Sequence, residues 1–406
     1  MVEKPPRATL KRSLGLAGLT LYGLGVTIGA GIYVLIGQVA GLAGAAAPFA
    51  FLAAALVAGL TAMSFAELSV RLPHSAGEAV YVRQGLGSPA LALVTGLAVA
   101  MTGMVAAAAV LIGASGYIAT LVPLAPWMIA VALIVLLAAL ALWGIAESVA
   151  AIGVVTLVEI GGLLVILAVA APVTLEASAW PAAAGLPVAA GSFTAAVVVA
   201  FFAFIGFEDM VNVVEEVRMP ARTMPLAIGL TLIATTVLYV ALVCAALGVA
   251  GPAELAASTA PLALVFERAT GLSAAPFAVV AGVATVNGVL VLLIMASRVL
   301  YGLARQGSLP ALLGHVWHRT GTPAPATLLA GAIVLAGALL LPIALLAQAS
   351  SMLTLTSFTL VNVALIALKR RDPAGTGGFR VPLWWPWLAA LASGGVLIAE
   401  VWRLAA

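Results

Sequence analysis

The sequence predicts an all-α integral membrane protein with about eleven transmembrane helices. Two observations support this fold class. Of the 406 residues, 64% are hydrophobic and 8% are charged, whereas a soluble domain carries about 25% charged residues. The apolar residues also form long unbroken runs, such as residues 127–142, rather than the ~10-residue alternating segments of an outer-membrane barrel. A soluble enzyme is therefore excluded.

The lengths of the apolar runs place the individual helices. A helix needs about 20 mostly apolar residues to cross ~30 Å of hydrocarbon, and in lipid a helix satisfies its own backbone hydrogen bonds. By this measure the predicted spans are residues 16–40, 47–70, 89–121, 124–143, 149–172, 193–214, 225–250, 275–303, 325–345, 348–368 and 383–402. The first span is too long and too rich in glycine for a cleavable signal peptide.

The basic residues predict the orientation of the chain. All 17 Lys and Arg residues except Arg268 and Arg403 lie in the tail 1–15 or on the same side of the membrane as this tail. Cytoplasmic loops are enriched in Lys and Arg. Residues 1–15 are therefore predicted to form a cytoplasmic N-terminal tail, and the protein is expected in the plasma membrane.

Several kinds of site and partner are not expected. The chain has one cysteine and three histidines, so neither an intramolecular disulfide nor a Cys/His metal centre is predicted. Its basic residues are scattered, which argues against nucleic acid as a partner. There is no Gly-x4-Gly-Lys-Ser/Thr motif, which argues against an ATP-driven pump. No cofactor is expected, and membrane lipid is the predicted surrounding.

The first span is unusually rich in glycine. Gly23, Gly25, Gly29 and Gly31 fall within nine positions, and each costs about 1 kcal/mol against alanine inside a helix. One interpretation is an interrupted helix, whose free N–H groups could bind a carboxylate. The alternative is close helix packing through small residues.

The sixth span favours the interruption. Gly206 precedes Glu208 and Asp209 near the middle of this span, and two carboxylates in lipid are costly unless they face a cavity or partners. Span 6 is the fifth span after span 1, and five is odd, so the two spans cross the membrane in opposite directions, as in an inverted repeat. Two interrupted helices in matching positions indicate a transport site at the membrane midplane. Free N–H groups in one span and free carbonyls in the other would suit an amino acid zwitterion.

Sequence motifs along nearly the whole chain resemble one family. They are Gly-Ala-Gly-Ile at 29–32, Glu-Leu at 67–68, Arg-Leu-Pro-His-Ser-Ala-Gly-Glu-Ala-Val-Tyr at 71–81, Phe-Ala-Phe-Ile-Gly-Phe-Glu at 202–208, Glu-Glu-Val at 215–217 with Pro220 and Pro225, and Ser-Arg-Val-Leu-Tyr at 297–301 with Ala-Arg-Gln-Gly at 304–307 and Leu-Pro at 309–310. In these motifs the chain resembles the amino acid-polyamine-organocation (APC) superfamily. It is most similar to the bacterial and cationic-amino-acid-transporter-like members.

The resemblance implies a 5+5 inverted-repeat transporter fold with discontinuous helices 1 and 6. The first repeat would cover residues 16–172, the second residues 193–368, and an additional helix residues 383–402. The family commonly has twelve spans, so the count of eleven puts in doubt any dimer contact made by a last helix. The implied function is secondary active transport of amino acids by alternating access. The expected substrate-binding residues are Ile28, Gly29, Ala30, Gly31, Ile32, Phe202, Phe204, Ile205, Gly206, Glu208 and Asp209.

Glu159 is the most informative single residue. It lies in span 5 with about ten apolar residues on either side, and some proton-coupled family members carry a lysine at what resembles this position. Burial disfavours the charged form of a carboxyl group, so a buried glutamate can bind and release a proton near neutral pH. Glu159 is therefore a candidate for proton coupling, with Asn287 of span 8 as its candidate neighbour. The alternatives are a structural acid and a plain interhelical hydrogen bond.

Two residues of span 6 have alternative roles. Asp209 departs from the small residue of most relatives, so it could attract a second amine of the substrate, or it could cap the second half of the helix. Phe202 resembles the aromatic residue that covers the substrate from outside, and its alternative role is packing.

The predicted function has rivals. Sodium is the rival coupling ion, and exchange of cationic amino acids, polyamines or other organic amines is the rival activity. An intramembrane enzyme would need a recognisable catalytic pair, and a channel would need a pore-lining ring.

Overall fold

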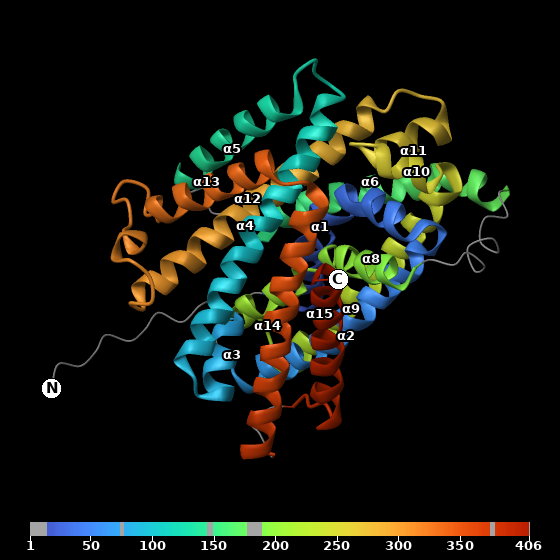
Figure 1. The fold of residues 1–406 in the computed structure, drawn as a ribbon. Helices are drawn as coiled ribbons and strands as arrows, with labels where there is room; N and C mark the ends of the chain where they lie inside the picture. Colours follow the sequence, from blue (N-terminus) through green and yellow to red (C-terminus); the bar gives the residue numbers. More distant parts are fainter. Residues whose placement is uncertain (1–13, 74–76, 144–148, 177–188, 374–377, 406) are drawn as a thin grey trace.

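The computed structural model describes residues 14–73, 77–143, 149–176, 189–373 and 378–405, and these residues are mostly helical (Figure 1). The long helices are α1 (Leu16–Ala43), α2 (Ala47–Arg71), α4 (Pro89–Ala119), α5 (Pro126–Trp143), α6 (Val149–Glu176), α8 (Ala190–Phe202), α9 (Pro220–Val249), α12 (Ala275–Arg305), α13 (Ala324–Leu340), α14 (Ile343–Arg371) and α15 (Trp384–Ala405). The shorter elements are α3 (Gly77–Leu86), α10 (Pro252–Ala257), α11 (Pro261–Thr270) and the 3-10 helices η1 (Gly44–Ala46), η2 (Phe207–Glu216) and η3 (Ala311–Gly314).

Each predicted span corresponds to one long helix or, for the sixth span, to α8 followed by η2. Within the described residues, nine helical stretches are long and apolar enough to cross a membrane, and one of them, Gly31–Arg71, extends from α1 through η1 to the end of α2. Leu16–Ile28 and Ala324–Leu340 are apolar but shorter. The prediction of an all-α, multi-pass membrane protein is therefore confirmed. Most of the predicted tail 1–15 lies outside the described residues.

The predicted interruption of span 1 is wrong, because α1 is one continuous helix. An unpaired backbone group in lipid costs several kcal/mol, which outweighs the ~1 kcal/mol cost of each glycine. The glycines allow close packing instead. A Cβ atom at Gly23 would overlap the side chains of Met210 and Thr231, and one at Gly31 would lie 3.0 Å from the Cα atom of Ala203. Close packing therefore accounts for both glycines.

The predicted interruption of span 6 is confirmed. Helix α8 ends at Phe202, the next four residues form a turn, and η2 begins at Phe207. Gly206 has a φ of 122°, a conformation that strains any residue with a side chain. A 3-10 helix of ten residues is also longer than the usual three or four, which often marks a functional or strained segment.

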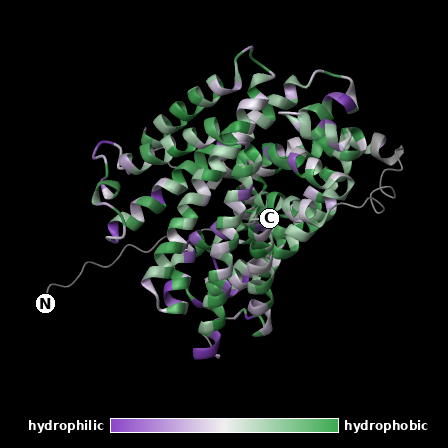
Figure 2. Ribbon diagram, viewed as in Figure 1, coloured by the Kyte–Doolittle hydropathy of each residue, from purple (hydrophilic) through white to green (hydrophobic). Residues whose placement is uncertain are grey.

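The helices pack around α1, which contacts α6, α8, α9 and α12, while α4 packs along α12 and α14. Helices α14 and α15 lie side by side, as do α5 and α13 (Figure 1). Hydrophobic residues cover most of the ribbon (Figure 2), and large apolar side chains point outward, such as Leu56 at 65%, Val135 at 62% and Ile233 at 65% exposure. A surface of this kind fits contact with lipid.

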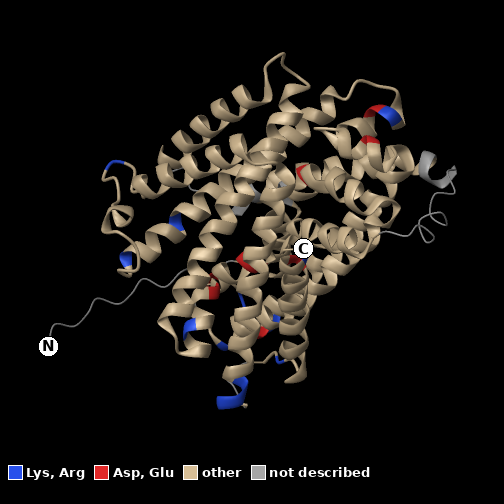
Figure 3. Cartoon of the chain, in the orientation of Figure 1, with Lys and Arg blue, Asp and Glu red and all other residues tan. Residues whose placement is uncertain are grey.

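Lys and Arg residues gather on the left and at the bottom of the view in Figure 3. We name this the basic end of the bundle, and it comprises α3 and the C-terminal ends of α2, α12 and α14, with Arg71, Arg83, Arg298 and Lys369. At the opposite end, Arg268 of α11 pairs with Glu254 of α10 at 3.0 Å.

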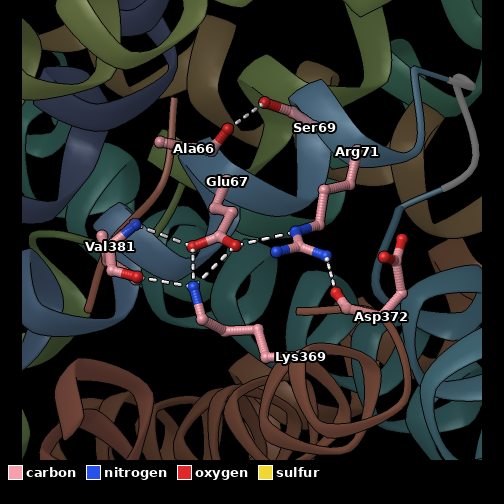
Figure 4. Close-up of polar contacts among 7 residues, drawn as sticks. All are labelled: Ala66, Glu67, Ser69, Arg71, Lys369, Asp372 and Val381. Atoms are coloured by element: carbon pink, nitrogen blue, oxygen red, sulfur yellow. Dashed lines mark hydrogen bonds and ion pairs between the residues drawn. The ribbon is translucent and has the colours of Figure 1, made fainter. Parts of the chain in front are cut away.

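A buried ion network connects three segments at the basic end (Figure 4). The fully buried carboxylate of Glu67 accepts hydrogen bonds from Nε of Arg71 at 2.7 Å, from Nζ of Lys369 at 2.8 Å and from the main-chain N–H of Val381 at 2.8 Å. Nη1 of Arg71 donates to the main-chain oxygen of Asp372 at 3.0 Å. The network therefore links α2 to the end of α14 and to the segment before α15.

Candidate functional site

A cavity of about 1090 Å³ lies inside the bundle, lined by α1, α3, α4, α6, the end of α8, the turn that follows it, η2, α12 and α14. At the basic end its lining side chains Arg83, Arg298 and Gln306 are exposed, whereas Phe202, which lines it at the end of α8, is 5% exposed. The cavity is therefore open toward the basic end and closed in the direction of Phe202.

The cavity brings together many of the residues expected at the site. Those that line it are Gly31, Glu159, Phe202, Ile205, Gly206, Glu208, Asp209 and Asn287. The structure places Ile28, Ile32 and Phe204 in the buried core, outside this lining, and Phe204 packs against the rings of Phe51 and Tyr239. Gly29 and Ala30 belong to α1, but their side-chain positions lie outside the described part of the chain.

Tyr239 of α9 joins α1 to the interruption of span 6. Its hydroxyl oxygen lies 3.0 Å from the main-chain oxygen of Thr27, 3.3 Å from that of Ile28 and 3.0 Å from that of Ala203. A tyrosine hydroxyl has one proton to donate, so three carbonyl oxygens share one donor. Tyr239 was not among the residues predicted for the site, although a hydroxyl within an apolar span was the available signal.

Glu159 lies on α6 with 1% of its surface exposed. Its Oε1 atom has no hydrogen-bond partner among the described residues, and the amide of Asn287 lies beside the carboxyl group. The main-chain oxygen of Glu159 accepts a hydrogen bond from the hydroxyl of Tyr33 at 2.7 Å. The predicted neighbours Glu159 and Asn287 therefore lie together, and Tyr33 is a further contact that was not predicted.

Glu208 and Asp209 have different partners. Oε2 of Glu208 accepts a hydrogen bond from the main-chain N–H of Gly206 at 2.8 Å, and Oδ1 of Asp209 accepts one from Nδ2 of Asn212 at 3.4 Å. Both side chains line the cavity, and that of Glu208 is held by the main chain of Gly206.

A third carboxylate, Glu78 of α3, lines the same cavity and is 8% exposed. Burial raises the pKa of Glu78 to about 7; its own main-chain N–H opposes this rise, and the negative charge of Asp209 adds to it. Burial and a like charge both disfavour ionisation of a carboxyl group. Within the described residues, no group of three or more His, Cys, Asp or Glu residues could hold a metal ion. Three carboxyl groups, those of Glu78, Glu208 and Asp209, therefore line one cavity.

The comparison with protein families shows which family the chain belongs to. A model of the family described as amino acid permease matches residues 14–402. The chain belongs to the amino acid permease family. This family membership confirms the APC superfamily that the motifs indicated, and it makes the protein a transporter rather than an enzyme.

Curated relatives of this permease have several different named substrates. The chain is 31% identical over 402 residues to the branched-chain amino acid permease BcaP of Bacillus subtilis, covering 92% of this chain and 84% of that protein. It is 30% identical to the methylthioribose transporter of the same organism, covering 92% and 85%. It is 29% identical to the vacuolar cationic amino acid transporter 2 of Arabidopsis thaliana, covering 90% and 61%.

Proposed function

We propose that this amino acid permease is a proton-coupled secondary transporter that moves amino acids across the plasma membrane by alternating access. Family membership supports amino acid transport. The observation that best supports proton coupling is the buried Glu159 on the cavity wall, with the amide of Asn287 beside its carboxyl group. An ionisable residue inside a membrane protein is costly, so it is a functional candidate by default.

Protonation would change the charge of Glu159 inside the protein. The neutral acid can remain in apolar surroundings, whereas the ionised form needs a compensating cation or water. A proton would therefore favour one arrangement of α1 and α6 over another, and a ligand that binds one conformation better shifts the population toward it. Because protonation of Glu159 changes the relative free energy of the two conformations, proton movement is coupled to substrate movement.

The amino acid would bind between α1 and the interruption of span 6. Main-chain carbonyls near Ile205 and the carboxylate of Asp209 would face the amino group. The substrate carboxylate would approach α1 near Gly29 and Gly31. Because α1 is continuous, its N–H groups are already paired, so binding there requires a local opening of the helix. The low helix propensity of glycine reduces the free energy of that opening.

The proposed topology follows from the basic end. We infer that this end faces the cytoplasm, together with the N-terminus, because Lys and Arg are enriched in cytoplasmic loops. The cavity is then open to the cytoplasm in this conformation. The proposed 5+5 inverted repeat, with residues 16–172 and 193–368 as its halves and 383–402 as an additional helix, is supported by the contact of α8 and η2 with α1.

A second candidate function is transport or exchange of organic amines, including cationic amino acids and polyamines. The carboxylates of Glu78, Glu208 and Asp209 at one cavity favour it, because negative charge attracts a substrate with a second amine. Sodium is the second candidate for the coupling ion, since an ionised Glu159 and nearby carbonyl oxygens resemble an oxygen-lined cation site.

Purified protein in liposomes tests these proposals. A melting-temperature screen of the twenty amino acids and common polyamines identifies the ligand, because a ligand that binds the folded state stabilises it. Uptake of that ligand should be saturable, should increase with an inward proton gradient and should not change when potassium replaces sodium. Uptake that requires sodium at fixed pH would contradict the proton assignment.

A further inference from the structure

Tyr33 of α1 contacts Glu159 of α6, the proposed coupling residue, across the interface between the two helices. It lies on α1, two residues after Gly31, and is fully buried. Its hydroxyl donates to the main-chain oxygen of Glu159 at 2.7 Å, a contact between residues 126 positions apart in the chain. Tyr33 therefore joins the helix proposed to bind substrate directly to the residue proposed to bind the proton.

The position of this hydroxyl is fixed by its surroundings. A Cβ atom at Gly162 of α6 would lie 3.1 Å from the Tyr33 hydroxyl and 2.7 Å from Val280, so the absence of a side chain at Gly162 makes room for the hydroxyl. The ring of Tyr33 stacks on Phe277, with centroids 6.2 Å apart and an interplanar angle of 26°. The hydroxyl of Tyr117 donates to the main-chain oxygen of Tyr33 at 2.7 Å.

These contacts leave Tyr33 little freedom to move without α6. The ring is packed in the core. If α1 and α6 separated, the hydroxyl would be left without a partner in an apolar environment. Leaving a buried donor unsatisfied costs more free energy than a typical hydrogen bond contributes to stability. A displacement of α1 at Gly31 would therefore displace the main chain of Glu159, or break this hydrogen bond.

We propose that Tyr33 is a positioning residue that links the conformation of α1 to the carboxyl group of Glu159, and thereby links substrate binding to proton binding. The proposal rests on the coupling role proposed for Glu159. Tyr33 does not touch the carboxyl group through its hydroxyl. It acts through the main chain, which sets where the carboxyl group lies relative to the Asn287 amide and the cavity.

Among the described residues, few other polar groups lie around Glu159. Helices α1, α9, α11 and α12 pack against α6. Their polar groups that face or interact with Glu159 are Tyr33 from α1, Tyr239 from α9 and Asn287 from α12. The charged residues of α11, Glu267 and Arg268, are exposed. A change in the pH dependence caused by Tyr33 would therefore report on Glu159 rather than on another nearby acid or base.

The first test is Tyr33→Phe, which keeps the packed ring and removes the hydroxyl. The affinity for substrate, measured from the shift in melting temperature at a pH low enough to protonate Glu159 fully, should change less than about twofold. Accumulation driven by a proton gradient should fall at least about fivefold, the lower end of typical coupling factors, and the pH at half-maximal uptake should shift. Ser115→Ala is the control, because it removes a buried hydroxyl that also donates to a main-chain oxygen at 2.7 Å, but within α4 rather than across to Glu159.

A second pair of variants acts on the same hydroxyl from α6. Gly162→Ala should displace the Tyr33 hydroxyl and shift the pH profile in the same way, whereas Gly161→Ala, whose Cβ would meet nothing within 4 Å, should not. These variants keep the proposal testable if Tyr33→Phe does not fold.

A double-mutant comparison separates this proposal from the proposed function. If Tyr33 acts through Glu159, adding Tyr33→Phe to Glu159→Gln should not shift the pH profile further. A parental pH profile and parental accumulation in Tyr33→Phe, while Glu159→Gln loses accumulation, would overturn the role of Tyr33 alone. Normal accumulation by Glu159→Gln would overturn both proposals.

Discussion

Gly206 lies so close to Val26 that a Cβ atom at position 206 would overlap the carbonyl oxygen of Val26. This contact places the interruption of span 6 directly against the middle of α1. The φ of 122° at Gly206 adds a second constraint, because residues with a side chain rarely adopt it. Gly206 therefore permits both the backbone conformation of the turn and the close approach of this turn to α1.

Gly206→Ala should abolish uptake. The substitution adds strain of about 1–3 kcal/mol from the backbone conformation and forces α8 and η2 away from α1. Uptake into liposomes and melting temperature in detergent measure both effects. Gly229→Ala on α9 is the control, because its Cβ would meet nothing within 4 Å and alanine favours a helix. Parental uptake by Gly206→Ala would show that the close contact with Val26 is not needed for transport.

Lys369→Met should destabilise the protein strongly. It leaves the fully buried Glu67 carboxylate with one charged partner fewer, and breaking a buried ion pair typically costs about 3–5 kcal/mol. Arg71 still pairs with Glu67, so the lower part of this range is expected. The control is Arg268→Met, which removes a half-exposed pair with Glu254 and should cost less than about 1 kcal/mol. Equal melting temperatures for the two variants would contradict this ranking.

The stability of the protein should decrease as the pH rises from about 4.5 to about 7, the interval between the ordinary and the raised pKa of Glu78. In this interval the native state binds more protons at Glu78 than the unfolded state does, so the free energy of unfolding falls with increasing pH. Glu78→Gln cannot ionise and should flatten this part of the melting profile, whereas the exposed Glu267→Gln should not. A profile unchanged by Glu78→Gln would assign the pH dependence to other groups.

Length and composition were sufficient to predict most of the helices, because a helix in lipid must be about 20 apolar residues long. They were not sufficient for α1. Glycine lowers helix propensity and also permits close packing, and the sequence does not contain the information that decides between them. Only the positions of Ala203, Met210 and Thr231 beside α1 show that the glycines allow packing.

Residues of the candidate site could be picked out from the sequence where a polar residue interrupts an apolar span. Glu159 and Asn287 stand out in this way, and the structure places them together. Tyr33 and Tyr239 do not stand out, because a tyrosine ring fits a packed core and its partner is set by tertiary structure. The pairing of Glu67 with Lys369, 302 positions apart, was unpredictable for the same reason.

Asp209→Asn should reduce the preference for substrates with a second amine by about 1–3 kcal/mol, as expected for loss of a hydrogen bond to a charged group. The side chain of Asp209 lines the cavity and accepts a hydrogen bond from Asn212, so we expect its charge to attract an amine of the ligand. Competition between a diamine and a neutral amino acid of equal size measures the preference. Glu254→Gln, at a carboxylate outside the cavity lining, is the control, and an unchanged preference in Asp209→Asn would exclude this role.

Glu159→Gln should still bind substrate but should lose accumulation against a gradient. Glutamine has nearly the shape of protonated glutamate and cannot release a proton, so the variant stays in the state that protonation favours. Exchange of labelled for unlabelled substrate should continue, because it needs no net proton movement. Uptake by the parent protein should increase with an inward proton gradient, whereas uptake by the variant should be independent of it. If the variant accumulates substrate as well as the parent, Glu159 is structural and the coupling site lies elsewhere.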